Sequence, residues 1–409
     1  QKQALIATNN DLVSERHPTY DLYVQRFMCS DPLITQRMAL GIAWAAQTAA
    51  GRAVPIYVAH SLGGGADMYI ESMMARDWER FGLPSVVLRV GGSQRWQVEL
   101  VLGEQRCRGT LQEISDVRRL LLPIERRRII YSCGVGDSDP LRLPLEILSV
   151  KTSEADQIDV LVHDYFMVSP TYTLLNEKGV YKGPSQPPNS SVGNRVSDRK
   201  WRASWGTLID EADRICVFSQ SSRDIIVEAY PLARWKIALK PHDLLCDVPK
   251  LPEPKRKNHR KTVAVLGNIG FHKGAEVVCE LGRLIERRDD ISVTVLGKFD
   301  PVFDLPSNVK VHGSYMIEDL ASLAEQYQVT DWLIPSIWPE TFSYTTNEAL
   351  ATGLPTHAFD IGAQGDAVAA APNGYAIDYS EGQNLAQNVL RSILSAGDTR
   401  EKLATAVGL

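Results

Sequence analysis

The feature that most constrains the fold is an alternation of short apolar runs with longer amphipathic stretches, which occurs twice along the 409 residues. The first series begins near Val54, and the second begins at Thr262, after a segment at 249–261 that is rich in proline and charge. Strands that alternate with helices form βαβ units around a parallel sheet. Because a chain of this length is too long for one ordinary core, each series predicts a separate α/β domain.

The apolar runs place the expected elements. In the first series we expect strands at 55–59, 85–90, 128–132, 158–163 and 214–218, and helices at 66–81, 114–122 and 205–212. In the second we expect strands at 262–266, 291–296, 309–312, 331–335 and 355–359, and helices at 275–288, 317–327 and 341–352. The segments 95–102 and 104–110 predict an antiparallel hairpin, and 179–200, rich in glycine, proline and serine, predicts a surface loop.

The division of the chain follows from these two series. Residues 1–50 predict a helical extension, 51–250 a first Rossmann-like domain and 251–409 a second. Two such domains place a cleft between two sets of strand ends, which is where open parallel sheets bind their ligands. The predicted fold class is therefore α/β, with two Rossmann-like domains that face each other across a cleft.

Composition restricts the class of partner. The hydrophobic content of 44% and charged content of 23% are typical of a soluble globular protein. The formal charge of -5 argues against nucleic acid, because phosphate contacts need a basic surface. Six scattered cysteines without a CxxC pair fit neither a zinc site nor a disulfide framework, so we expect a reducing, cytoplasmic compartment.

Targeting signals are not expected from the sequence. No stretch approaches the ~20 apolar residues of a membrane span. Residues 1–11 lack the basic and then apolar pattern of a signal peptide. Because the first residue is Gln1 and not methionine, we expect the sequence to be part of a longer protein.

Two glycine-rich segments each follow an expected strand and open a helix. The segment 60–67 (HSLGGGAD) includes Gly64 and Gly65, which allow a ligand to approach the backbone at a helix N-terminus. The segment 267–274 (GNIGFHKG) adds Lys273, so backbone N–H groups and one ammonium could share a diphosphate. A plain turn in the first and a solvated lysine in the second are the alternatives.

The segment 339–353 (PETFSYTTNEALATG) carries two glutamates, Glu340 and Glu348, eight residues apart. On a helix that begins near 341, a rise of ~1.5 Å per residue separates them by about 12 Å, close to the span of a nucleoside diphosphate between sugar and ribose. Their angular positions place both toward one cleft. Free N–H groups at Phe342 and Ser343 could hold phosphate oxygens. The alternative is a capping Glu340 and an exposed Glu348.

These motifs resemble glycosyltransferase family 4, whose members have the GT-B fold and retain anomeric configuration. Glu340 and Glu348 resemble its E-x7-E motif, the segment 267–274 its phosphate loop, and 63–67 its N-terminal glycine loop. The likeness covers about residues 54–380 and is densest from 262 to 370. Among the members, the bacterial transferases that build surface polysaccharides are the most similar.

The resemblance implies a role for several residues. Glu348 would bind the ribose hydroxyls and Glu340 the hydroxyls of the donor sugar, while Lys273 would neutralise the leaving diphosphate. Gly64 and Gly65 would approach the diphosphate or the acceptor from the first domain. Gly267, Gly270 and Asn268 would belong to the donor loop.

Three positions depart from the family pattern. Asn268 stands where an arginine is usual, which removes one bidentate phosphate ligand. Ser343 replaces a glycine and Asp67 replaces a glutamate. These departures bear on catalysis and donor identity more than on the fold.

The triplet of His163, Asp164 and Tyr165 ends the expected strand 158–163. A histidine at a strand end can bind a sugar hydroxyl or assist the transition state, and the resemblance places a histidine near the reacting sugar. Asp164 could orient His163 or, with Tyr165, meet the acceptor. A purely structural histidine is the alternative.

Two further patterns each have a functional interpretation and a purely structural alternative. Asp137 and Asp139 form a D-x-D triplet, but its setting between glycine and proline favours a turn, and we expect no metal. The segment 199–205 (RKWRASW) interleaves cations with tryptophans, which would suit an anionic membrane surface if the tryptophans are exposed. A charged helix start with buried tryptophans is the alternative.

We therefore expect a glycosyltransferase that moves a hexosyl or deoxyhexosyl unit from a nucleotide-diphosphate sugar to a glycan or lipid-linked glycan in bacterial polysaccharide synthesis. We expect it to need no cofactor and to be cytoplasmic, with peripheral contact at the inner face of the membrane left open. Two alternatives remain: a sugar-nucleotide epimerase on the same fold, and a non-catalytic glycosyltransferase-like module.

Overall fold

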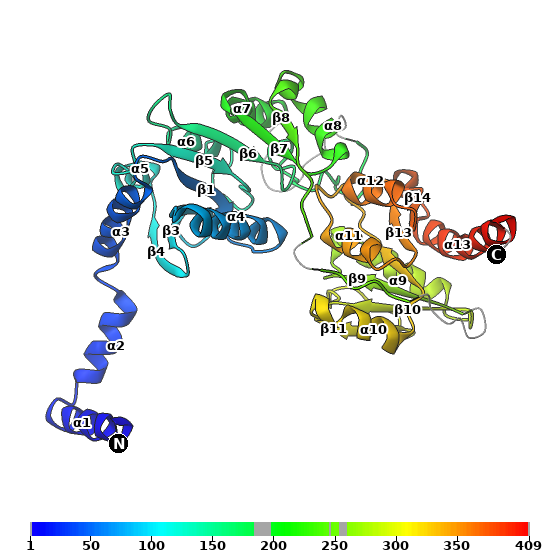
Figure 1. Cartoon of the computed structure of the whole chain (residues 1–409), viewed down its shortest axis with the longest axis horizontal. Helices are drawn as coiled ribbons and strands as arrows, with labels where there is room; N and C mark the ends of the chain where they lie inside the picture. Colours follow the sequence, from blue (N-terminus) through cyan, green and yellow to red (C-terminus); the bar gives the residue numbers. More distant parts are fainter. Residues whose placement is uncertain (1, 184–197, 245–246, 253–259, 408–409) are drawn as a thin grey trace.

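The computed structural model describes residues 2–183, 198–244, 247–252 and 260–407. Three helices come first: α1 (Lys2–Arg16), α2 (Tyr20–Ser30) and α3 (Ile34–Ala49). Figure 1 shows α1 and α2 projecting away from the two domains, while α3 reaches the first of them. Helix α3 buries Met38, Ile42, Ala45 and Ala49, a spacing of three and four residues that lines one helical face. These three helices lie before the first strand, and among the described residues only the third packs a buried face on the first domain.

The first domain contains an eight-stranded sheet with the order β4-β3-β2-β1-β5-β6-β7-β8. Its strands are β1 (Val54–His60), β2 (Ser85–Val90), β3 (Trp96–Leu102), β4 (Gln105–Leu111), β5 (Arg127–Tyr131), β6 (Gln157–Leu161), β7 (Arg214–Val217) and β8 (Ile237–Leu239). All neighbours are parallel except the pairs made by β3, which is antiparallel to β2 and β4. The expected hairpin is therefore the edge of this sheet.

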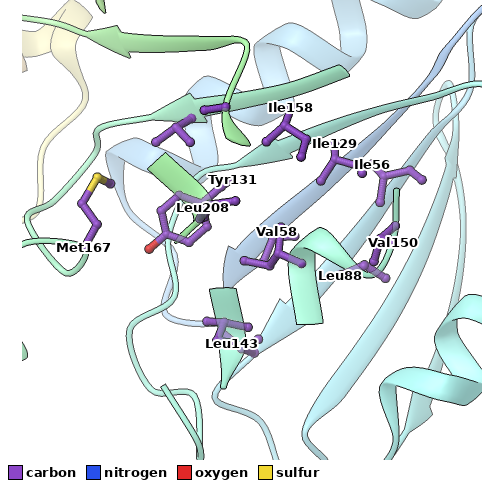
Figure 2. Close-up of a cluster of buried hydrophobic side chains, with 14 of the residues drawn as sticks. Ile56, Val58, Leu88, Ile129, Tyr131, Leu143, Val150, Ile158, Met167 and Leu208 are labelled. Carbon is purple, nitrogen blue, oxygen red and sulfur yellow. The ribbon is translucent and has the colours of Figure 1, made fainter. Parts of the chain in front are cut away.

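Helices cover both faces of that sheet. They are α4 (Gly65–Phe81), α5 (Ile114–Leu120), α6 (Leu143–Leu148), α7 (Asp198–Glu211), α8 (Gln220–Ala229) and the 3₁₀ turn η1 (Pro231–Trp235). Along β1, Ile56 and Val58 join one apolar cluster, and Tyr57 and Ala59 join another, because successive side chains point to opposite faces. Figure 2 shows the first cluster, with side chains from several strands meeting those of α6 and α7.

The second domain contains a parallel six-stranded sheet with the order β11-β10-β9-β12-β13-β14. Its strands are β9 (Lys261–Leu266), β10 (Ile291–Leu296), β11 (Val309–Gly313), β12 (Asp331–Ile334), β13 (Thr356–Phe359) and β14 (Gly374–Ile377). The helices are α9 (Ala275–Leu284), α10 (Leu320–Tyr327), α11 (Tyr344–Ala351), α12 (Gly362–Ala370) and α13 (Leu385–Val407), with 3₁₀ turns η2 (Phe271–Lys273), η3 (Ile317–Asp319) and η4 (Ser380–Gly382). The predicted α/β fold with two Rossmann-like domains is confirmed.

Several element boundaries differ from the expected ones. Helix α7 begins at Asp198 and not at 205, because Trp201 and Trp205 both lie on its buried face. Helix α11 begins at Tyr344 and not at 341, so Glu340 lies in the preceding loop. Strands β8 and β14 and helices α6, α8 and α12 were not expected. Of the expected loop 179–200 and linker 249–261, residues 184–197 and 253–259 lie outside the described residues.

Candidate functional site

The two domains meet at the loops that follow their parallel strands. Thr341, beyond β12, donates its hydroxyl to the carbonyl oxygen of His163, beyond β6, at 2.9 Å. Ser221, at the start of α8, donates its backbone N–H and its hydroxyl to the Asp366 carboxylate on α12, at 2.8 and 2.7 Å. All four residues belong to the loops or helices that directly follow parallel strands, since α8 follows β7 and α12 follows β13. Ligands of such sheets bind at these ends, so the seam between the domains is the candidate site.

An ion pair lies on the second-domain side of this seam. The Lys273 ammonium is 2.8 Å from Glu340 Oε2, and Glu340 is only 2% exposed. The other carboxylate oxygen, Oε1, is buried and has no hydrogen-bond partner among the described residues. The backbone N–H of Glu340 donates to Gln364 Oε1 at 3.1 Å. The structure thus brings two predicted site residues together and leaves one carboxylate oxygen able to accept a hydrogen bond.

The turn that carries Lys273 depends on Gly274. This glycine has φ of +85°, and a Cβ there would lie 2.0 Å from the Pro335 carbonyl oxygen. The turn therefore packs directly on the backbone that leads to Glu340. A side chain at 274 would separate the two segments, so the glycine is needed for the ion pair.

A small cavity of about 50 Å³ lies beside this pair. Its lining comes from the loop after β9, from the chain after β12 and from the first turn of α11, and includes Gly267, Asn268, Lys273, Ser336 and Thr345. A helix leaves the N–H groups of its first turn without intrahelical partners, and these favour anions. The cavity therefore joins a cation, a glycine loop and a helix N-terminus in one place.

The start of α11 corrects one expectation. Phe342 lies before the helix and Ser343 is its N-cap residue, so the first-turn N–H groups begin at Tyr344 and not at Phe342. Ser343 is buried, and its hydroxyl accepts from the Thr346 hydroxyl at 2.7 Å. The estimate of about 12 Å between the two glutamates assumed a helix over both, and it does not apply because residues 340–343 are not helical.

The other donor-side residues occupy different environments. Glu348 is half-buried on α11, and burial raises the pKa of its carboxyl. Asn268 is exposed, and its Oδ1 accepts from the Lys298 backbone N–H at 3.3 Å. Gly267 has φ of +107°, and the Gly270 carbonyl oxygen accepts from the Lys273 backbone N–H at 3.1 Å. The two glycines therefore shape the loop that holds Lys273.

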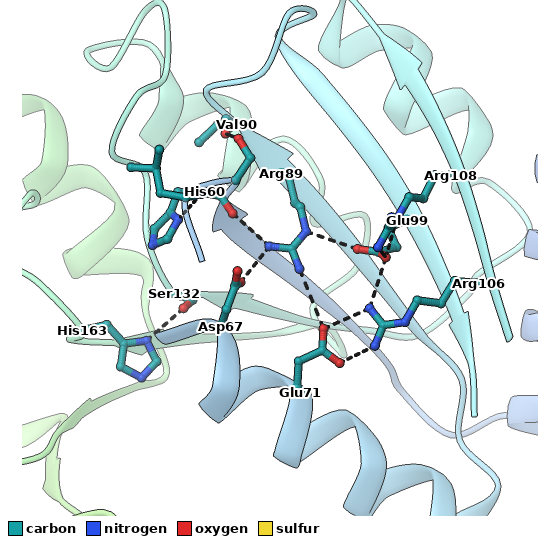
Figure 3. A network of polar contacts seen from close by, with 12 residues as sticks. His60, Asp67, Glu71, Arg89, Val90, Glu99, Arg106, Arg108, Ser132 and His163 are labelled. Carbon is teal, nitrogen blue, oxygen red and sulfur yellow. Dashed lines mark hydrogen bonds and ion pairs between the residues drawn. The ribbon is translucent and has the colours of Figure 1, made fainter. Parts of the chain in front are cut away.

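His163 lies on the first-domain side of the seam. Its Nδ1 is 2.9 Å from the Ser132 hydroxyl, and its ring stacks on Phe218 with a centroid distance of 4.9 Å (Figure 3 shows His163 and Ser132). Nε2 is buried without a partner among the described residues. Burial lowers the pKa of His163 well below its ordinary value, so the ring is neutral at neutral pH. Strand β6 ends at Leu161, which places His163 in the following loop and not on the strand.

Asp164 and Tyr165 do not line an open site. Asp164 is 7% exposed and accepts from the Cys133 thiol at 2.7 Å and from the Phe166 backbone N–H at 2.8 Å. Burial raises the pKa of Asp164 to about 6. Tyr165 is fully buried, with its hydroxyl 3.0 Å from that of Ser222. Both residues support the loop that carries His163, and their expected contacts with an acceptor stay a prediction.

The glycine loop of the first domain faces α11. Gly64 has φ of +98° and open space around it, and Gly65 begins α4. A Cβ on Gly65 would lie 3.4 Å from the Tyr344 ring. The structure therefore places the loop 63–65 against the N-terminus of α11, on the far side of the seam.

Figure 3 shows the charged network that holds this loop. Arg89, on β2, donates to Asp67 Oδ1 at 2.7 Å, to the His60 carbonyl oxygen at 2.9 Å and to Glu99 Oε2 at 3.1 Å. These contacts fix both ends of the segment 60–67. Asp67 therefore pairs with Arg89 and stabilises this loop from within the first domain.

Replacing Gly65 with valine is expected to lower donor affinity or turnover about tenfold or more. The added methyl groups would press on the Tyr344 ring, and overpacking costs about 1–3 kcal/mol. Gly65→Ala adds only an ordinary contact at 3.4 Å and serves as the matched control. Equal kinetics for the alanine and valine variants would contradict the packing of this loop on α11.

His242 is a residue of the seam that the sequence pattern did not reveal. It belongs to the chain between β8 and β9, stacks on Phe218 at a centroid distance of 3.9 Å, and contacts Phe342 edge-on at 4.7 Å. Its ring therefore joins both domains. Nδ1 is buried without a partner among the described residues. No motif or periodicity marks a histidine in an irregular segment, so only the three-dimensional arrangement identifies it.

Burial lowers the pKa of His242 to about 4. Its folded-state pKa lies below the unfolded value of about 6.5, so its contribution to stability is complete above about pH 6.5 and is lost as pH falls toward 4. We expect His242→Phe, which keeps the stacking ring, to show a shallower fall of melting temperature between pH 6.5 and 4 than the wild type. Parallel curves for the two proteins would exclude this titration.

Two further sequence patterns are part of the first-domain structure. Asp137 accepts from the Asp139 backbone N–H at 2.8 Å and pairs with Arg95 at 3.3 Å, which is a turn and an ion pair. Among the described residues no group of three or more metal-ligating side chains is present. Trp201 and Trp205 are buried, which agrees with the alternative of a charged helix start with buried tryptophans. No helix in the described ranges is long and apolar enough to cross a membrane.

One family of known proteins matches part of the chain. Residues 248–407 match the family described as glycosyl transferases group 1. This segment includes the second sheet and all second-domain residues of the candidate site. No curated protein matches the chain in sequence.

Solved structures share the two-domain architecture. HepE from Anabaena, in complex with UDP and glucose, has a TM-score of 0.51 at 14% identity, over 84% of this chain and 91% of that one. Sucrose-phosphate synthase from Thermosynechococcus elongatus has a TM-score of 0.50 at 15% identity, over 84% and 90%. At these identities the likeness concerns the fold. The chain therefore has the GT-B fold of glycosyltransferases, and its second domain matches the family of glycosyl transferases group 1.

Proposed function

We propose that this protein is a glycosyltransferase that moves a sugar from a nucleotide-diphosphate donor to a glycan or lipid-linked glycan. The observation that carries the proposal is the Lys273–Glu340 pair beside a glycine loop and a helix N-terminus, at the seam between two Rossmann-like domains. A diphosphate that leaves an anomeric carbon needs cationic and N–H stabilisation, and both are gathered here. The group 1 match covers the same residues.

Each residue has a distinct role in this proposal. Lys273 stabilises the leaving diphosphate, and Glu340 Oε1 accepts a hydrogen bond from a hydroxyl of the donor sugar. Glu348 binds the ribose hydroxyls at the other end of the donor. His163 presents its unpartnered Nε2 to the reacting sugar from the first domain. We propose retention of configuration and no resident metal or cofactor, since Lys273 and the N–H groups supply the stabilisation that a metal gives elsewhere.

The donor sugar is proposed to be a hexose or deoxyhexose, and the pathway to be bacterial polysaccharide synthesis in the cytoplasm. HepE was solved with UDP-glucose, with a TM-score of 0.50 at 14% identity over 83% of this chain and 89% of that one. We therefore propose a uridine diphosphate sugar as the first donor to test.

A thermal-shift panel tests nucleotide binding directly, because a ligand at a hundred times its Kd stabilises the folded state by about 2.7 kcal/mol. The panel contains UDP, ADP, GDP and their glucose conjugates. We expect one nucleoside diphosphate to raise the melting temperature selectively. Donor turnover, measured as release of the nucleoside diphosphate with and without glycan acceptors, then separates a transferase from a non-catalytic module.

Two results would overturn the proposal. If no donor in the panel binds, the seam is not a nucleotide site. If a donor binds and is converted to a free altered sugar at the same rate with and without acceptor, the epimerase alternative holds. Phe81→Ala, an exposed side chain at the end of α4 and outside the seam, is the control that should leave both measurements unchanged.

A further inference from the structure

A second cavity has a volume of about 660 Å³ and shares no lining residue with the small cavity beside Lys273. Its walls are the first-domain segments 135–141 and 170–176, Trp201 of α7, and Phe271 and His272 of the second domain. This volume is within the usual range of small-molecule sites, about 300–1,000 Å³. The cavity therefore has the size of a ligand site and spans both domains.

One wall contains Asp137, whose two carboxylate oxygens differ in their hydrogen bonds. Asp137 is 8% exposed, and its Oδ1 accepts from the Asp139 backbone N–H at 2.8 Å and from Arg95 at 3.3 Å. Its Oδ2 is buried and has no hydrogen-bond partner among the described residues. Buried polar atoms without a partner are uncommon in native structures and call for an explanation. A ligand hydroxyl that donates to Oδ2 supplies one.

The other walls are aromatic. Trp201 and Phe166 meet edge to face with a centroid distance of 5.0 Å, and the Trp201 indole N–H donates to the Phe166 carbonyl oxygen. Phe271 is 41% exposed and completes the opposite side. Ligand pockets combine an apolar lining with a few polar groups that orient the ligand. Apolar rings beside a carboxylate suit a saccharide, which has C–H faces and donating hydroxyls.

The position of the cavity connects it to the donor site. Phe271 and His272 belong to the same 3₁₀ turn as Lys273, which pairs with Glu340 at 2.8 Å. A ligand in the cavity therefore lies beside the turn that holds the leaving diphosphate in the proposed function. The cavity is on the first-domain side of that turn, because 15 of its 17 lining residues precede residue 202 and only Phe271 and His272 come from the second domain.

We propose that this cavity binds one saccharide unit of the acceptor, with a hydroxyl on Asp137 Oδ2 and a sugar face on Phe271. That the saccharide belongs to the acceptor rests on the proposed function, but saccharide binding itself can be measured without turnover. The D-x-D triplet would then contribute a sugar contact and not a metal ligand.

The test uses the full chain and isothermal titration with methyl glycosides of glucose, galactose, mannose, N-acetylglucosamine and rhamnose, in the presence of UDP. We expect at least one glycoside to bind the wild type. Asp137→Asn should weaken that binding about tenfold or more, since hydrogen bonds to charged groups contribute about 1.5–3 kcal/mol. Phe271→Ala should weaken it about tenfold, since it removes the ring on which the sugar face packs. Affinity for UDP should change less than twofold in both variants.

Trp235→Ala is the matched control, because Trp235 is an aromatic residue on a 3₁₀ turn that is 84% exposed and does not line the cavity. It should change neither affinity. Phe271 is partly exposed, so its variant keeps the test decisive if Asp137→Asn does not fold.

Three results would overturn the inference. They are failure of every glycoside to bind the wild type, unchanged glycoside affinity in Phe271→Ala, and a parallel loss of UDP affinity, which would make the cavity part of the nucleotide site. Failure of the proposed function is a different result, because the wild type would then bind no nucleoside diphosphate at all.

Discussion

Replacing Lys273 with alanine is expected to lower donor turnover by about 10²–10³-fold, the usual loss when one preorganised charge stabiliser of a transition state is removed. The Lys273 ammonium lies 2.8 Å from Glu340 and lines the small cavity in which a diphosphate is proposed to bind. The positive charge is most useful when the diphosphate leaves and its negative charge grows. Turnover should therefore fall more than nucleotide affinity, and steady-state kinetics with nucleotide titrations measure both.

The variant has a structural cost that must be separated from its catalytic effect. Without Lys273, the Glu340 carboxylate is 2% exposed and unpaired, and such a charge destabilises a fold. The double variant Lys273→Ala/Glu340→Gln removes this charge. We expect it to recover most of the melting temperature while activity remains lost. Recovery of turnover together with stability would show that Lys273 acts only as a structural partner of Glu340.

The sequence was most informative where a pattern repeats along the chain. The alternation of apolar and amphipathic segments predicted β2 with its bounds, and it predicted the hairpin of β3 and β4. The spacing in 267–274 and 339–353 selected Lys273 and Glu340, which the structure joins in one ion pair. Local motifs after successive strands converge because the carboxyl ends of parallel strands lie at one edge of a sheet.

The sequence was less informative where tertiary packing decides the outcome. Helix α11 begins three residues later than expected, because Thr341 bonds to His163 across the seam and Ser343 is the N-cap. Serine is a favoured N-cap residue, but the sequence pattern predicts a helix start at 341, directly after Glu340. His242 and the cavity around Asp137 depend on contacts between the two domains, which one sequence does not reveal.

A buried cluster of charged residues lies at the starts of β9 and β12 in the second sheet and contacts α13. Asp331 is fully buried at the start of β12 and accepts from the Lys261 ammonium at 3.2 Å, from the Thr330 hydroxyl at 2.6 Å and from the His357 ring at 3.3 Å. His357 Nδ1 is 2.8 Å from the Ser392 hydroxyl on α13, and Lys261 also donates to the Ile393 carbonyl oxygen. The cluster therefore ties three strands to one helix.

Removing one partner from this cluster is expected to be strongly destabilising. Lys261→Met leaves the Asp331 carboxylate buried without its cation, and breaking a buried pair in this way costs about 3–5 kcal/mol. Lys261→Met/Asp331→Leu replaces both charges with apolar groups and is expected to lie closer to the wild type, because two hydrophobic residues of similar volume often match a buried pair. Urea denaturation at pH 7, followed by circular dichroism, measures the free energy of unfolding of each variant.

The pH dependence of the same variants gives a second, independent measurement. Burial alone would raise the pKa of Asp331, but the His357 hydrogen bond and the Lys261 charge hold it below its ordinary value. The folded-state pKa is therefore lower than the unfolded value of about 3.9, so the stabilisation is complete above about pH 4 and is lost as pH falls through the folded value. The wild type should lose stability below pH 4 more steeply than the double variant, which has no carboxyl at 331. If the single variant is as stable as the wild type at pH 7, or if both proteins titrate alike below pH 4, the cluster does not anchor α13 as its geometry indicates.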